Sequence, residues 1–318
     1  MPTRVNQAGG EVARPSLKAT SPRYGEKLIK AFLFLCAGLS VLVTTAIVIS
    51  LLVPTVDFFS EVSLTEFLFG TEWQPGRGTQ TSYGVLPIVV GTLNITVIAL
   101  IVAIPVGLLS AFYLSEYANP RLRRIVKPVL EVLAGIPTVA IGLFALYFMK
   151  PFFADLLPWV DLDGLFSQGV AGVAVGVMIV PLVASVAEDA MRAVPPGLRE
   201  GAFALGATKL RVTLKVVFPA AISGIVAACV LAASRAIGET MVVLIAAGAS
   251  PKLVGPWEFG ESVLTMTAYI GRTATGDIAT GTITYKTIFA VGTLLFFMTL
   301  IMNLISIRLV RRFREVYE

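Results

Sequence analysis

The sequence contains no histidine, only two cysteines and few charged residues, and each shortage excludes a class of function. Without histidine the chain builds no His-based catalytic triad, no His-ligated metal site and no histidine proton relay. Cys36 and Cys229 each lie inside an apolar run, so we expect no disulfide framework, and we predict no metal site. Charged residues make up 14% of the 318 residues and hydrophobic residues 56%, with a mean hydropathy of +0.84. This composition predicts a protein whose main solvent is the lipid bilayer.

Six apolar runs long enough to cross a bilayer predict an all-α integral membrane protein. They cover about residues 31–53, 85–114, 129–153, 168–187, 220–249 and 286–307. Most of the 25 Lys and Arg residues lie before the first run, in the second and fourth connections and after the last run. The positive-inside rule therefore places both termini in the cytoplasm. Residues 1–27 are polar and basic, which predicts a disordered cytoplasmic tail, and no nucleic-acid partner is needed to explain the net charge of +5.

Small residues in the fourth run predict close helix packing. Gly172 and Gly176 form a small-xxx-small pair, which lets a neighbouring backbone approach closely. The outer segments 54–84 and 250–285 are long and carry Gly, Thr, aromatic and acidic residues. We expect both to serve as contact surfaces.

The fourth connection is neither disordered in composition nor apolar enough to enter the membrane. Residues 195–197, Pro-Pro-Gly, end the preceding helix. The apolar residues of 198–205 follow a helical face, and Gly206 breaks that helix. A second amphipathic stretch, 210–218, leads to Pro219 at the start of the fifth run. This pattern predicts two short helices that project on the cytoplasmic side.

The spacing within this connection resembles the signature of the permease subunits of bacterial ATP-binding-cassette importers. That signature reads Glu-Ala-Ala, three residues, Gly, nine residues, Ile, one residue, Leu-Pro. The chain has the corresponding residues Glu200, Gly201, Ala202, Gly206, Val216, Phe218 and Pro219 at the same spacing. The resemblance implies a type I importer permease fold whose coupling helix docks on an ATPase subunit, through Glu200, Gly201, Ala202, Gly206 and Pro219. No Gly-x-x-x-x-Gly-Lys-Ser/Thr loop occurs, so ATP and Mg²⁺ are expected on a separate ATPase polypeptide, and this chain is expected to be no enzyme.

Arg235 is the one arginine deep inside an apolar run. A charge at that depth costs at least about 2.5 kcal/mol, so we expect it to face a partner or a water-filled path. Glu239 lies four residues on and shares a helix face with Arg235, so the two side chains are expected to pair. Ser234, Arg235, Glu239 and Thr240 are the candidate residues of a path for an anion, because a guanidinium donates several hydrogen bonds to an oxyanion. A purely structural ion pair explains the same two charges.

A wider resemblance covers about residues 28–318. The stretches 67–75, 235–240, 266–270 and 311–317 are similar to the C-type permease of the bacterial phosphate-specific importers. The resemblance implies one permease domain over 28–318, with its coupling loop at 195–219, in the inner (plasma) membrane. It also implies transport of inorganic phosphate and the partners of such importers: a second, A-type permease subunit, a dimer of the B-type ATPase and an external phosphate-binding protein.

Other functions stay open at this point. A permease for another oxyanion such as sulfate would share the coupling motif. A gradient-driven anion transporter would explain Arg235 and Glu239 but would leave 195–219 without a role, and a membrane-embedded hydrolase lacks a plausible nucleophile and base. Four acids near span ends have no assigned role and are expected to be solvated: Glu116, Glu131, Glu188 and Asp189.

Overall fold

The computed structural model describes residues 24–76 and 81–313, which are mostly helical. The chain divides into two compact units, Met1–Ser50 and Leu51–Glu318, and each is described by itself. Helix α1 (Tyr24–Glu61) begins in the first unit and ends in the second. Of the predicted tail, 1–27, residues 1–23 lie outside the described residues. Residues 24–27 form the start of α1, so the prediction is wrong for them.

Among the described residues, five helices are long and apolar enough to cross a membrane. They are Gly25–Glu61, Leu86–Tyr117, Thr138–Leu156, Gln168–Arg192 and Ile283–Arg311. A sixth span is possible if the bent pair Lys209–Ala220 and Ile222–Ile237 counts as one. The predicted second, fourth and sixth spans are confirmed by three long helices. These are α3 (Leu86–Phe112), which continues as the π-helix η1 (Tyr113–Tyr117), α7 (Gln168–Arg192) and α14 (Ile283–Phe313).

The predicted third span, 129–153, is wrong at its start. Helix α4 (Pro120–Leu133) is a separate amphipathic helix, which Asn119 caps by accepting a hydrogen bond from the Leu122 backbone. A turn then precedes Pro137, because a proline disfavours helical backbone at the residue before it. The span itself runs through α5 (Thr138–Phe144), η2 (Ala145–Met149) and α6 (Lys150–Leu156).

The predicted fifth span, 220–249, is not one helix. The short helix α10 (Phe218–Ala220) is followed by a bend of 71° and then by α11 (Ile222–Ile237). Residues 238–240 are not helical and separate α11 from α12 (Met241–Ala246). A glycine at the end of α11 favours this break, because glycine loses the most conformational entropy inside a helix.

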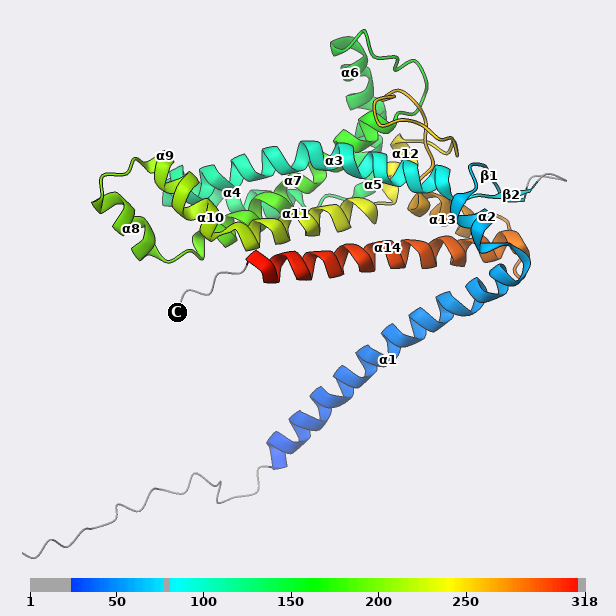
Figure 1. Cartoon of the computed structure of the whole chain (residues 1–318), viewed down its shortest axis with the longest axis horizontal. Helices are drawn as coiled ribbons and strands as arrows, with labels where there is room; N and C mark the ends of the chain where they lie inside the picture. Colours follow the sequence, from blue (N-terminus) through cyan, green and yellow to red (C-terminus); the bar gives the residue numbers. More distant parts are fainter. Residues whose placement is uncertain (1–23, 77–80, 314–318) are drawn as a thin grey trace, which may run out of the picture. The chain divides into compact units, whose positions relative to one another are not determined.

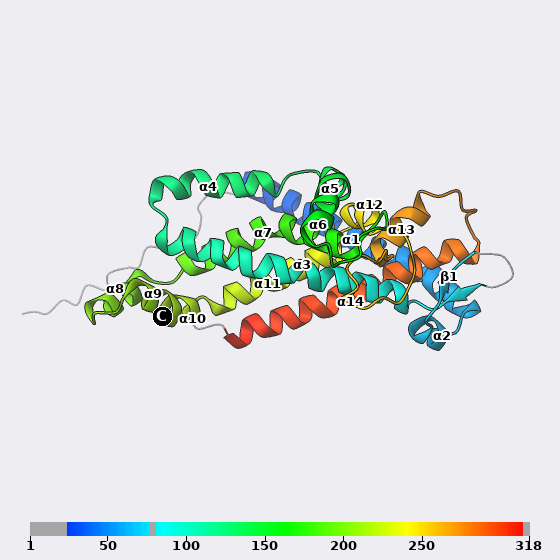
Figure 2. The same cartoon turned by 90° about the horizontal axis from the view of Figure 1, so that it is seen from above.

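Helices α3, α7, α11 and α14 run side by side in the unit that starts at Leu51 (Figures 1 and 2). The predicted small-residue pair on α7 allows a close approach of α3. A side chain at Gly172 would lie 2.6 Å from the Ile98 side chain, and one at Gly176 would lie 2.8 Å from the carbonyl oxygen of Ala99. The core between these helices consists mainly of Ala, Val and Ile. In lipid, helices associate through such close packing.

The two ends of this bundle differ in composition. At one end lie α2 (Leu64–Phe69), the antiparallel strands β1 (Trp73–Gln74) and β2 (Ser82–Tyr83), and α13 (Met266–Ala274) (Figure 2). Edge-to-face aromatic contacts hold this end together, among them Trp73 against Tyr269 with ring centroids 4.9 Å apart. At the other end lie α8 (Pro196–Ala204), α9 (Lys209–Val212) and η3 (Thr213–Val217).

Candidate coupling helix and anion path

Helix α8 begins and ends where its sequence requires. Pro196 occupies the first turn, where a missing backbone N–H costs no hydrogen bond. At the other end, the N–H of Gly206 donates to the carbonyl of Phe203, and the N–H of Ala207 donates to the carbonyl of Ala202. Gly206 has a φ of 77°, in the left-handed region that favours glycine. This pair of hydrogen bonds is a Schellman motif, and it fixes the turn between α8 and α9.

Most of α8 faces away from the bundle. Leu205 is 89% exposed and Phe203 is 45% exposed, although both side chains are apolar. The structure places the predicted coupling residues as follows: Glu200, Gly201, Gly206 and Pro219 are exposed, and Ala202 is half-buried against the core at this end of the bundle. The predicted pair of short helices is thus confirmed. Helix α8 is the exposed one, with apolar side chains typical of a surface that a partner covers, whereas α9 and η3 bury Val212, Thr213 and Val217.

Arg199 connects α8 to the membrane-spanning helices. Its guanidinium donates to the backbone carbonyls of Met191 and Val194, each at 2.7 Å, at the C-terminal end of α7. It also donates to Glu116 Oε1 at 3.2 Å, in the π-helical segment η1 that continues α3. The Arg199 side chain is 19% exposed and that of Glu116 is 8% exposed. One side chain therefore joins α8 to the ends of two spans.

Glu188 joins α7 to α4. Its side chain is 1% exposed, and it accepts hydrogen bonds from Arg123 Nε at 2.6 Å and from Lys127 Nζ at 3.0 Å. Arg192 Nε lies 3.8 Å away, and Lys127 also donates to Asp189. Desolvation lowers the pKa of Lys127, but the hydrogen bonds and charges of Asp189 and Glu188 outweigh it, so the pKa is raised above its usual value. A buried carboxylate held by several cations fixes the two helices together.

The expectation that four unassigned acids are solvated is therefore wrong for two of them. Glu188 is buried and Glu116 half-buried, and both are paired, whereas Glu131 and Asp189 are exposed. The sequence carried one signal of this network, because two cations of α4 lie four residues apart on one face of an amphipathic helix. Their partner lies on another helix, which helical periodicity does not reveal.

Arg235 lies in the last turn of α11 and is exposed. Together with Ser234 it lines a hollow of about 450 Å³, whose other residues include Met178 and Leu182 of α7 and Ala134 after α4. Ser234 also donates to Asn303 Oδ1 of α14 at 3.4 Å. The guanidinium therefore lies at an open hollow whose other lining residues are mostly apolar. That it faces a partner or a water-filled path stays a prediction.

Glu239 does not pair with Arg235 among the residues that the structure describes. Its carboxylate instead accepts hydrogen bonds from the backbone N–H groups of Met241 and Val242, at 3.1 and 3.2 Å. The acid is buried, and its backbone carbonyl accepts a hydrogen bond from Thr267. The predicted ion pair is wrong because α11 ends at residue 237, so the spacing of four no longer brings the two side chains together. Thr240 lies within the break and donates to a backbone carbonyl two residues before it.

Several helices long enough to cross the bilayer, with an arginine at a hollow among them, are the features expected of a membrane transport permease. Residues 103–315 match the family described as "Binding-protein-dependent transport system inner membrane component". The chain therefore belongs to this family of inner-membrane transport components. Its several candidate membrane spans agree with that membership.

Its relatives are named as permeases and not as enzymes. The "Probable ABC transporter permease protein YqgH" of Bacillus subtilis is 33% identical, over 78% of this chain and 80% of the relative. The "Phosphate transport system permease protein PstC 1" of Mycobacterium tuberculosis is 34% identical, over 77% of this chain and 81% of the relative. The corresponding protein PstC of Xylella fastidiosa is 32% identical, over 77% and 80%.

Solved structures confirm the fold. A bacterial alginate ABC transporter, in complex with a pentasaccharide-bound periplasmic protein, contains a chain with a TM-score of 0.61 and 16% identity. The match covers 92% of this chain and 98% of that one. The inward-facing MetNI methionine ABC transporter gives a TM-score of 0.53 with 22% identity, over 73% and 95%. The predicted type I importer permease fold is thereby confirmed.

Proposed function

We propose that this chain is a membrane-spanning permease subunit of an ATP-driven importer for inorganic phosphate. The substrate follows from relatives named as phosphate transport permeases, which are 32–34% identical over 77% of the chain. We also propose that both termini and α8 lie in the cytoplasm, because the connections near that end carry most of the Lys and Arg residues.

The observation that carries the energy coupling is the exposure of α8. Leu205 and Phe203 present apolar surface on a short helix outside the bundle. Burial of a side chain of that size contributes about 1.5–3 kcal/mol, so a docked partner stabilises this surface. The partner is a dimer of a separate ATPase that binds ATP and Mg²⁺, and the residues from Glu200 to Gly206 enter its groove.

The anion path runs past the hollow of Arg235. A guanidinium facing lipid would cost at least about 2.5 kcal/mol, so the hollow is closed by a second permease subunit or filled by water. Arg235 and Ser234 donate hydrogen bonds to the passing anion, and Glu239 and Thr240 hold the break that ends α11 beside them. The third partner, an external phosphate-binding protein, docks at the end that bears α13 and the strands.

Uptake by the reconstituted importer tests this function. Liposomes that contain the whole complex take up labelled phosphate only while ATP is hydrolysed, and labelled sulfate much more slowly. Arg235→Gln lowers phosphate uptake, whereas Arg308→Gln, an exposed cation in α14, leaves it unchanged. Normal uptake by the Arg235→Gln complex would remove the path proposal. Uptake driven by an ion gradient without ATP would remove the importer proposal, and preferred sulfate uptake would change the substrate.

A further inference from the structure

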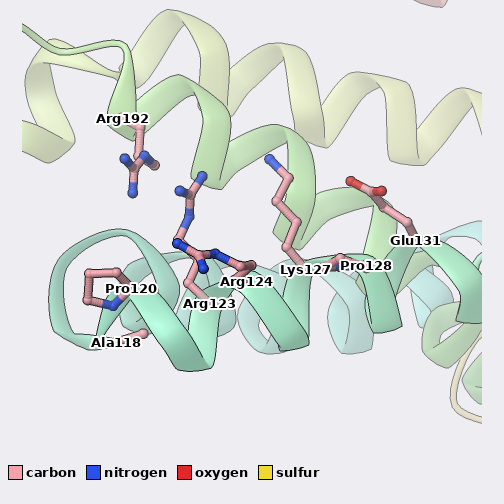
Figure 3. A pocket seen from close by; sticks show the side chains of 8 residues that line it. All are labelled: Ala118, Pro120, Arg123, Arg124, Lys127, Pro128, Glu131 and Arg192. Carbon is pink, nitrogen blue, oxygen red and sulfur yellow. The ribbon is translucent and has the colours of Figure 1, made fainter.

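A basic hollow lies between α4 and the C-terminal end of α7. Its volume is about 420 Å³, and four cations line it: Arg123, Arg124, Lys127 and Arg192. Glu131 is the acid in its lining. Figure 3 shows the three arginine side chains gathered at one end of the hollow and Glu131 at the other. Arg235 does not line this hollow but a different one.

Two of these cations keep their hydrogen-bond donors available. Buried Glu188 engages Arg123 and Lys127. Arg192 is half-exposed and approaches Glu188 only at 3.8 Å, and Arg124 is exposed and has no hydrogen bond or ion pair with any other described residue. Neighbouring guanidinium groups repel each other, and an anion between them removes that repulsion. Phosphate-type anions match the guanidinium fork, which donates two parallel hydrogen bonds.

The apolar face of α4 indicates where such an anion comes from. Ile125, Val129 and Val132 are 66%, 51% and 73% exposed, and α4 has no buried residue. A helix with a basic polar face and an exposed apolar face is typical of one that lies at the membrane interface. Free phosphate would occupy the hollow and leave this apolar face uncovered. A phospholipid satisfies both surfaces, with its headgroup on the cations and its acyl chains along α4.

We propose that the hollow between α4 and α7 binds the phosphate headgroup of an anionic phospholipid from the cytoplasmic leaflet. The leaflet follows from the orientation given above for the importer, and basic pockets between membrane helices on that side are suited to anionic headgroups. The bound lipid adds negative charge beside Arg124 and Arg192 and so holds the N-terminal half of α4 against the end of α7.

Lipid counting on the intact complex tests the proposal. The detergent-purified importer is titrated with phosphatidylglycerol, phosphatidylcholine or inorganic phosphate, and bound molecules are counted by native mass spectrometry. Arg124→Gln is the decisive variant, since this side chain has no partner among the described residues and its loss leaves the Glu188 network intact. Arg121→Gln is the matched control, because Arg121 is an exposed cation of the same helix that does not line the hollow.

Arg124→Gln weakens phosphatidylglycerol binding about tenfold or more, as expected for loss of charged hydrogen bonds. Arg121→Gln weakens it at most about fivefold, the effect of one surface cation. Four results overturn the proposal: equal binding by wild type and Arg124→Gln, equal loss in both variants, equal binding of phosphatidylcholine, or occupation by inorganic phosphate in preference to lipid. The lipid-free complex with Arg124→Gln should melt at the wild-type temperature, which shows that the variant folds. This readout involves no transport, so its failure leaves the importer proposal intact.

Discussion

Replacement of Arg199 by glutamine tests whether one side chain holds α8 to the spanning helices. The guanidinium donates to two carbonyls at the end of α7 and to Glu116, and most of the remaining surface of α8 is exposed. Glutamine is shorter and uncharged, so it loses the contact with Glu116 and reaches at most one of the carbonyls. The substitution therefore loosens α8 while its own helical sequence is kept.

The expected magnitude follows from these three hydrogen bonds. A hydrogen bond to a charged group contributes about 1.5–3 kcal/mol when it is shielded from water. Carbonyls at the end of a helix accept water instead, and Arg199 is 19% exposed, so the total is discounted. The substitution should therefore lower the free energy that holds α8 to the spanning helices by about 2–3 kcal/mol. This corresponds to about a 30- to 150-fold larger population in which α8 is detached.

Hydrogen exchange of the α8 amides measures that population in the assembled complex. Arg199→Gln should accelerate exchange over residues 196–204 about 30-fold or more and should lower phosphate uptake per ATP hydrolysed. Arg199→Lys keeps the charge without the planar fork, so its exchange rate should lie between those of wild type and Arg199→Gln. Arg211→Gln, which removes an exposed cation of α9, should leave exchange over these residues unchanged. Unaltered exchange in Arg199→Gln would refute the reasoning, whatever the transport rate.

Three further predictions concern stability, each read from thermal or chemical unfolding in detergent. Gly206→Ala should cost about 1–2 kcal/mol, because no atom lies within 4 Å of the added Cβ and the whole cost is the left-handed backbone; a cost near zero would contradict the φ of 77°. Glu188→Gln should cost about 2–3 kcal/mol, below the value for a fully buried pair, since the cations that lose their buried acid are partly exposed, whereas exposed Asp189→Asn should cost less than about 1 kcal/mol. Lys127 has a raised pKa, so its stabilising contribution is fully present below the usual value of 10.5 and is lost as the pH rises through the raised value. The difference in melting temperature between wild type and Lys127→Met should be constant from about pH 7 to pH 9. It should shrink only as the pH approaches the raised pKa of Lys127.

The spans that the sequence predicted well are those bounded by clear changes in hydropathy. The runs at 85–114, 168–187 and 286–307 form α3, α7 and α14. The prolines inside α3 and α7 do not end these helices. The third and fifth runs are apolar as well, yet Pro137 and Gly238 divide them. Mean hydropathy records only whether a segment prefers lipid, whereas the backbone conformation depends on single residues.

The candidate site was predictable in part for a related reason. The coupling residues lie within one continuous connection, so their local spacing was enough to predict α8 and the turn at Gly206. The pairing of Arg235 with Glu239 required an unbroken helix, and α11 ends between them. The partners of Glu188 lie more than sixty residues away, so only the packing of α4 on α7 reveals them. Periodicity describes one helix at a time, and buried charges are paired between helices.

Helix α7 takes part in both candidate sites, which determines how they are mechanically related. Its C-terminal end accepts the hydrogen bonds of Arg199 and so carries α8. Met178 and Leu182, further back along the same helix, line the hollow of Arg235. Close packing at Gly172 and Gly176 fixes the N-terminal half of α7 against α3, while Pro181 removes one backbone donor between that half and the end that bears α8. The C-terminal half is fixed as well, because Glu188 pairs with cations of α4. A force applied to α8 therefore acts on a helix that is held on both sides of Pro181, so a bend is expected near that proline, at the wall facing Arg235.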